Sequence, residues 1–135
     1  MPLNTKPREL VFDLETSGHI MFGFGVGKQH VSYLQLLTDC KIVCICYRWR
    51  DEPLDVYHEL HWSKSQCDKQ MLKKFIKVAE QADVIIGQNH ERFDIRWVNQ
   101  RIAYHQLDRQ LPIIVADDLY RLVKRKLYLP CYKLD

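Results

Sequence analysis

The order of β-type runs and amphipathic stretches most strongly constrains the fold of this chain. Residues 10–16 (LVFDLET), 41–50 (KIVCICYRWR) and 54–62 (LDVYHELHW) are rich in apolar, β-branched and aromatic residues, as strands are. The Asp-Glu-Pro sequence at 51–53 predicts a turn between the second and third runs. The first half of the chain is therefore expected to form three antiparallel strands.

The second half alternates between helical and strand patterns. Apolar residues recur at helical spacing in 67–82 and 93–104, and a basic helix is expected over 117–126. Short apolar runs at 84–87 and 111–116 predict buried strands between these helices. Three antiparallel strands followed by βα units predict an α/β fold, with a mixed sheet flanked by helices.

Composition narrows the class of protein. The 135 residues suffice for a single domain, and 47% hydrophobic with 27% charged residues excludes general disorder. No apolar run approaches the roughly 18 residues needed to cross a bilayer, so no membrane association is expected. The N-terminal segment lacks the apolar core of a secretory signal, and we expect a cytoplasmic protein.

Charge, cysteine and glycine usage exclude several kinds of site. A net charge of +3 is too small to attract nucleic acid in general, so phosphate affinity would need local placement of charge. Five cysteines without a CxxC pair disfavour a disulfide scaffold and a zinc ribbon. The glycines between 18 and 27 predict a flexible or tightly turned connection, and GFGVGK lacks the spacing of a phosphate loop.

Two carboxylates share one face of the first strand. Asp13 and Glu15 are two residues apart, so their side chains point the same way, roughly 6–7 Å apart. The alternating apolar residues then face the opposite side. An ordinary solvated face explains this pattern, and so does a cation site, because hard divalent ions prefer carboxylate oxygens.

A third carboxylate follows the strand at 84–87. Asp94 falls in the first turn of the next helix, where the helix dipole alone would explain an acid. It also ends the segment N-x-x-x-F-D (Asn89–Asp94), directly after a buried strand. If that strand lies beside the first one, Asp94 converges on the face of Asp13 and Glu15.

The two segments together resemble a known family. D-x-E-T at Asp13–Thr16 with N-x-x-x-F-D at Asn89–Asp94 resembles the first two motifs of the DEDD (DnaQ-like) 3′–5′ exonuclease superfamily. The likeness covers nearly the whole chain and is strongest to small predicted phage exonucleases and the YprB-type group. Proofreading domains of family B DNA polymerases share both motifs. The resemblance implies a ribonuclease H-like fold and metal-dependent hydrolysis of phosphodiester bonds in DNA or RNA.

The resemblance also implies residue roles. Asp13 and Glu15 would bind a first Mg²⁺ or Mn²⁺ ion, and Asp13 with Asp94 would hold a second. Thr16, Asn89 and Phe93 match positions that contact a single-stranded 3′ end. Phe93 would stack on a base, or alternatively would fill the strand–helix junction as a core aromatic.

One element of the family pattern is missing. The superfamily carries a fourth acid in a third motif, Y-x-x-x-D or H-x-x-x-x-D, and only two residues separate Tyr132 from Asp135. By the same resemblance, Asp135 matches instead the end of a K-L-D sequence that precedes the third motif and caps the start of the next helix. We therefore expect residues 1–135 to be a single domain truncated before the third motif and lacking the last helix. A missing C-terminal segment or a protein partner would supply the fourth acid.

Two classes of function follow from this gap. The first is a two-metal 3′–5′ exonuclease, weak or inactive in isolation. The second is a catalytically impaired module of the same fold that binds nucleic acid or a protein partner.

Positive charge gathers near the end of the sequence. A solvated helix face explains it, and a groove that follows phosphates is the alternative. Asp117 and Asp118 precede this helix, where they would cap it or contact the site. The basic residues are Arg121, Lys124, Arg125, Lys126 and Lys133.

Overall fold

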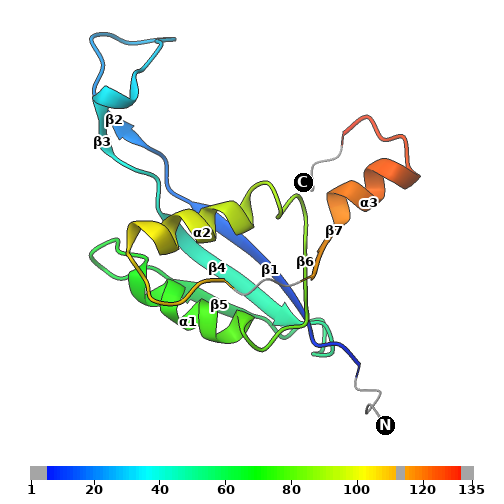
Figure 1. The fold of residues 1–135 in the computed structure, drawn as a ribbon. Coiled ribbons are helices and arrows are strands. Elements are labelled where there is room, and N and C mark those ends of the chain that lie inside the picture. Colours follow the sequence, from blue (N-terminus) through cyan, green and yellow to red (C-terminus); the bar gives the residue numbers. More distant parts are fainter. Residues whose placement is uncertain (1–5, 112–114, 132–135) are drawn as a thin grey trace.

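The computed structural model describes residues 6–111 and 115–131 and contains a five-stranded mixed sheet in the order β5-β4-β1-β6-β7 (Figure 1). The first three strands of this sheet in chain order pair antiparallel, and its last two run parallel to the first. The strands are β1 (Glu9–Thr16), β4 (Ile42–Trp49), β5 (His58–His61), β6 (Val84–Gly87) and β7 (Val115–Asp118). The predicted α/β class is confirmed.

The third predicted strand is shorter than expected. β5 begins at His58 rather than at residue 54, because the preceding segment forms a loop folded onto the end of β4. The Arg48 guanidinium donates to the carbonyl oxygens of Glu52 and Pro53, and the Glu52 carboxylate accepts the Trp49 N–H at 2.9 Å. These bonds satisfy backbone groups that a longer strand would otherwise use.

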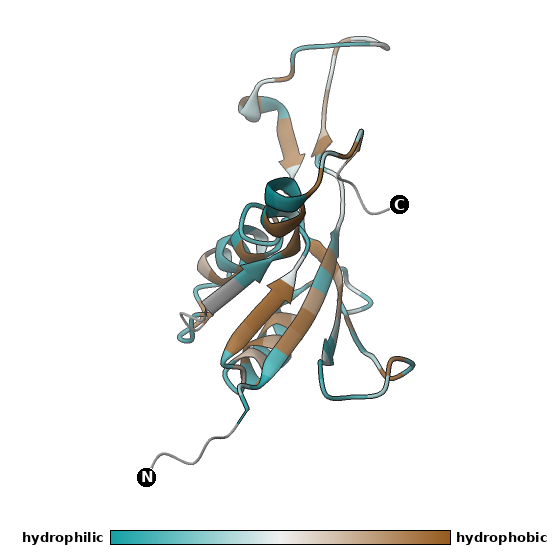
Figure 2. Ribbon diagram, turned by 90° about the vertical axis from the view of Figure 1, so that its right-hand side faces the viewer, coloured by the Kyte–Doolittle hydropathy of each residue, from teal (hydrophilic) through white to brown (hydrophobic). Residues whose placement is uncertain are grey.

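Helices α1 (Lys69–Ala79) and α2 (Asp94–Tyr104) cover one face of the sheet (Figure 1). The residues of β1 at even positions point into this layer and are buried, and the rings of Phe12 and Phe75 lie 4.8 Å apart. Figure 2 shows hydrophobic residues along the middle of the sheet strands. Burial of these even positions leaves Asp13 and Glu15 on the opposite, uncovered face.

A buried ion cluster joins the two helices. Asp68, fully buried before α1, accepts from Arg101 Nε at 2.7 Å, and its other oxygen lies 2.6 Å from His105 Nε2. Burial alone would raise the pKa of Asp68, but hydrogen bonds from Arg101, His105 and the Ile42 N–H hold that pKa below its ordinary value. The helix predicted over 67–82 spans Lys69–Ala79, and the Asp68 side chain before it bonds to α2 instead of capping α1.

The glycine-rich connection forms a projecting arm. It carries the strand pair β2 (Ile20–Met21) and β3 (Leu36–Thr38) and the short helix η1 (Tyr33–Gln35), and it extends away from the sheet (Figure 1). The sequence predicted a turned connection here but no strands. Large apolar side chains are exposed along the arm, among them Ile20, Phe22, Phe24, Val26, Tyr33, Leu34 and Leu37.

The last elements are β7 and the basic helix α3 (Leu119–Lys126). The strand predicted over 111–116 begins at Val115 and continues to Asp118, and residues 112–114 lie outside the described part of the chain. Lys133 and the Tyr132–Asp135 segment also lie outside it. Across the described ranges, no helix is long and apolar enough to cross a membrane.

Candidate nucleic-acid cleft

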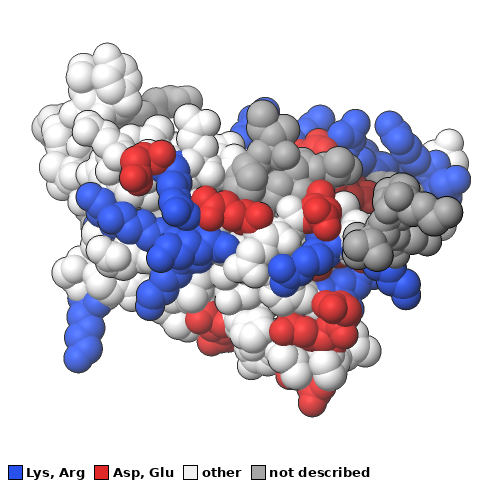
Figure 3. All heavy atoms as spheres, turned by 60° about the horizontal axis from the view of Figure 1, so that its bottom comes forward, with Lys and Arg blue, Asp and Glu red and all other residues white. Residues whose placement is uncertain are grey.

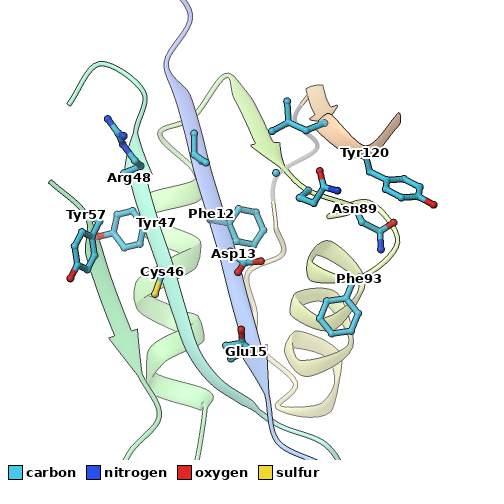
Figure 4. A pocket seen from close by; sticks show the side chains of 14 residues that line it. Phe12, Asp13, Glu15, Cys46, Tyr47, Arg48, Tyr57, Asn89, Phe93 and Tyr120 are labelled. Carbon is cyan, nitrogen blue, oxygen red and sulfur yellow. The ribbon is translucent and has the colours of Figure 1, made fainter. Parts of the chain in front are cut away.

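A cleft of about 1110 Å³ lies on the uncovered face of the sheet, where the carboxyl ends of β1, β6 and β7 meet (Figure 4). Its size lies at the upper end of the range of small-molecule sites, roughly 1,000 Å³. Carboxylates lie on its floor, and aromatic rings stand on both sides (Figure 4). Its lining comprises Val11, Phe12, Asp13, Glu15, Cys46, Tyr47, Arg48, Tyr57, Gly87, Gln88, Asn89, Phe93, Leu119 and Tyr120.

Asp13 and Glu15 lie in this cleft as the alternation of β1 predicts. Both are exposed, and they stand opposite Cys46 and Cys44 of β4 in the antiparallel register. The register then shifts between Glu15 and Thr16, which ends the regular ladder. This bulge fixes the two carboxylates at the last regular positions of the strand.

Asp94 approaches from the other side of β1 and is only 2% exposed. The parallel ladder between β1 and β6 stops at Val11, so the Leu14 N–H has no strand partner on that side. The Asp94 carboxylate accepts this N–H at 3.2 Å, in place of a strand carbonyl. A backbone group left open by the short β6 thus holds the first residue of α2 against β1.

The environment of Asp94 disfavours its charged form. Burial, followed by the negative charge of Asp13, raises the pKa of Asp94 from 3.8 to about 7. The backbone N–H groups of Leu14 and of Asp94 itself act in the opposite direction, and the Asp13 carboxyl lies within hydrogen-bonding reach. A divalent cation bound here would be stabilising, because few hydrogen bonds offset the negative charges of the two neighbouring carboxylates.

Carboxylate oxygens are suitable ligands for such a cation, and two of the three predicted carboxylates lie close together. Asp13 and Asp94 offer hard oxygen donors side by side. Glu15 shares the face of Asp13 but lies further along β1. Among residues 6–111 and 115–131, no three His, Cys, Asp or Glu side chains are close enough together to hold a metal ion.

The three expected substrate contacts differ in position. Phe93 is 42% exposed at the mouth of the cleft, edge-on to Trp97 at 6.4 Å, so it does not plug the core. Asn89, half-buried with a φ of 55°, presents its side chain near the same mouth (Figure 4). Thr16 lies beyond the bulge of β1, and the described residues that line the cleft do not include it.

Asp118 fixes the loop that carries Asn89. One oxygen of this buried carboxylate accepts the Asn89 N–H at 2.8 Å and the Tyr120 N–H at 3.0 Å. It therefore caps α3 and also holds the loop after β6 in its left-handed conformation. Both alternatives given by the sequence for the Asp117–Asp118 pair, helix capping and contact with the site, hold for Asp118.

His90 was not identified from the sequence. Its ring is fully buried, and its Nδ1 lies 4.0 Å from Asp118 Oδ2, with no hydrogen-bond partner for either ring nitrogen among the described residues. A Cβ added at Gly87 would come within 2.9 Å of the His90 Cβ. This close approach requires glycine at the end of β6. The sequence hint of this close approach was the glycine that ends the apolar run VIIG.

The β5 side of the cleft was also missed. Arg48 lies opposite Val11 in the register, and Tyr57 stands 64% exposed at the edge. Once the pairing of β1 with β4 is known, alternation alone places Cys46 and Arg48 on the face of Asp13. These residues could not be identified from the sequence because the register between the two strands was unknown.

Charges are mixed rather than gathered over much of the surface. Figure 3 shows Lys and Arg side chains interspersed with Asp and Glu on one face of the molecule. In the cleft itself, the charged lining residues are Asp13, Glu15 and Arg48. Phosphates would therefore meet more negative than positive charge on its floor, unless a cation is bound there.

Comparisons with known proteins support the fold. No protein-family model matches the chain, and no curated protein matches it. A solved structure that matches is the family B DNA polymerase from the hyperthermophilic archaeon Pyrobaculum calidifontis, with a TM-score of 0.63 and 17% identity. The match covers 90% of this chain and 16% of the polymerase. At this identity, the likeness shows a shared fold.

Proposed function

We propose that this chain is a ribonuclease H-like nuclease domain that hydrolyses phosphodiester bonds from the 3′ end of DNA or RNA. The observation that carries the proposal is that Asp13, which lines an aromatic-sided cleft, lies beside the buried Asp94. Both acids belong to the motifs that resemble the DEDD exonucleases. A fold shared with a DNA polymerase supports a nucleic-acid substrate.

The strand order supports the finer fold assignment. An antiparallel meander, extended on the side of its first strand by two parallel strands, is the arrangement expected from the resemblance. Helices α1 and α2 cover one face and leave the carboxylate face open (Figure 1). The cleft lies at the carboxyl ends of the parallel strands, where α/β sheets commonly bind ligands, and this position supports the proposed site.

Five side chains would act on the metal ions and the substrate. Asp13 and Glu15 would hold one divalent cation, Mg²⁺ or Mn²⁺, and Asp13 with Asp94 would hold a second, as the resemblance implies. Such a cation lowers the pKa of bound water and offsets charge on the phosphate. Phe93 would stack on the terminal base, and Asn89 would bond its sugar or base.

The fourth acid of the family has no counterpart in residues 1–135. We propose that a protein partner would supply such an acid. Activity of the 135-residue chain alone is then low, because an uncompensated cation charge weakens metal binding.

The test is cleavage of 5′-labelled single-stranded DNA and RNA, with Mg²⁺ or Mn²⁺ and with EDTA. We expect slow, metal-dependent 3′ shortening that Asp13→Asn and Asp94→Asn abolish. Asp51→Asn, a change at an exposed turn, is the matched control and should cleave like the parent. Cleavage that survives both site substitutions would refute the assignment.

A binding module without catalysis is the second candidate. Its supporting observation is that only two carboxylates gather among the residues that the structure describes. This candidate predicts binding of single strands in EDTA without shortening in Mg²⁺ or Mn²⁺. The same assay therefore separates the two functions.

A further inference from the structure

Helix α3 is amphipathic, yet none of its residues is buried. Leu119 and Leu122 are 38% and 48% exposed, while its last turn carries Lys124, Arg125 and Lys126. A surface helix usually buries its apolar side against the core. The uncovered position of α3 therefore needs another explanation.

The first turn of α3 forms part of the cleft. Leu119 and Tyr120 line it, on the side where Asn89 and Phe93 stand (Figure 4). The Lys124 ammonium lies over the Tyr120 ring, 5.2 Å from its centroid. An aromatic cleft residue thus connects directly to the basic turn.

Asp118 makes this connection rigid. Its carboxylate binds the Tyr120 N–H at 3.0 Å and the Asn89 N–H at 2.8 Å, so α3 is anchored to the loop beside the carboxylates. A ligand that contacts Asn89 in the cleft would therefore find the basic turn at a fixed distance.

The cleft floor carries mostly negative charge, whereas α3 beside it carries positive charge. The cleft holds Asp13 and Glu15, and its Arg48 guanidinium is engaged by the carbonyls of Glu52 and Pro53. Residues 119–131 contain no acid. Within the described part of the chain, Arg125 and Lys126 are exposed and form no ion pair, although Arg121 pairs with Glu91 at 2.8 Å.

We infer that α3 is the surface along which the phosphate backbone of a single-stranded nucleic acid lies as it leaves the cleft. The inference rests on the proposed function and adds the path of the strand. The terminal nucleotide lies between Phe93 and the carboxylates. The next phosphates pass Tyr120 and meet Arg125 and Lys126.

A lipid surface is the competing partner for a short basic helix with exposed leucines. The position of Leu119 favours nucleic acid, because this side chain lines the cleft instead of standing on an outer face. A strand enters such a cleft, whereas a flat bilayer does not.

The experiment compares two charge reversals of equal size. Arg125→Glu with Lys126→Glu changes α3, and Lys73→Glu with Lys74→Glu changes exposed lysines of α1, which covers the opposite face. Binding of fluorescent oligothymidylates of 4 and 20 nucleotides is measured in Ca²⁺, which takes the same oxygen ligands as Mg²⁺, over a series of salt concentrations. All altered side chains are exposed, and circular dichroism checks that both variants fold.

For the α3 variant, we expect at least tenfold weaker binding of the 20-mer and little change for the 4-mer, which reaches only the cleft. The slope of log K against log salt, which is negative, should become less steep by about 1.4, at about 0.7 for each of two lost phosphate contacts. Arg125→Gln with Lys126→Gln should give an intermediate loss. The α1 variant should bind within about twofold of the parent.

Equal losses in both charge reversals, or none in the α3 variant, would overturn the inference and leave the proposed function standing. Binding of the parent chain to phosphatidylserine vesicles that requires α3, with 20-mer binding that does not, would also overturn it. Failure of the parent chain to bind any oligonucleotide would overturn both the inference and the proposed function.

Discussion

Replacing Asp94 by Asn is expected to stabilise the metal-free protein at alkaline pH. In the native state, burial and the charge of Asp13 raise the pKa of Asp94 from 3.8 to about 7. Between these values the unfolded state releases the proton and the native state keeps it. The contribution of Asp94 is therefore most favourable below about pH 4 and is lost as the pH rises through 7.

The size of this free-energy effect follows from how far the pKa of Asp94 is raised. Each pKa unit corresponds to about 1.4 kcal/mol, so ionisation of Asp94 costs the native state about 4 kcal/mol above pH 7. Asn keeps an oxygen that can accept the Leu14 N–H, so the contact at 3.2 Å survives the change. The stability advantage of Asp94→Asn over the parent should grow by about 1.4 kcal/mol per pH unit from pH 4 to 7 and then level off.

Urea unfolding in EDTA between pH 4 and 8 measures this difference, with Asp51→Asn as the control. A variant less stable than the parent at pH 8, or a difference that does not change with pH, would refute the argument from burial and charge. Adding Mg²⁺ at pH 8 extends the test. The parent should gain stability in proportion to occupancy of the site, and Asp94→Asn should gain little.

Three further substitutions test the surroundings of the site. Asp68→Asn leaves the buried Arg101 without its counter-charge and should lower the free energy of unfolding at pH 7 by about 3 kcal/mol. Because the pKa of Asp68 is lowered, this loss should shrink only as the pH falls below its ordinary value of 3.8, and urea titrations that show a constant loss there would contradict it. Gly87→Ala sets a methyl group 2.9 Å from the His90 side chain and should lower the melting temperature measurably, whereas Gly18→Ala, in open space, should not. Phe93→Ala should weaken binding of a 4-mer oligonucleotide by about 1–3 kcal/mol in fluorescence titration, and unchanged affinity would exclude base stacking there.

Local patterns in the sequence determined much of this protein. Alternation along β1 placed Asp13 and Glu15 on one face and the apolar residues on the other, and helical spacing set Asp94 in a first turn. These features depend on the period of a strand or helix, which neighbouring residues define. The α/β class followed from the order of such segments.

Tertiary structure decided which of these residues meet. Asp94 reaches β1 because the ladder with β6 stops at Val11 and leaves the Leu14 N–H open, a consequence of register between strands far apart in the sequence. The same long-range geometry leaves Glu15 outside the Asp13–Asp94 pair and Thr16 off the cleft. Register and backbone hydrogen bonds across the sheet are non-local, so spacing along the chain does not encode them.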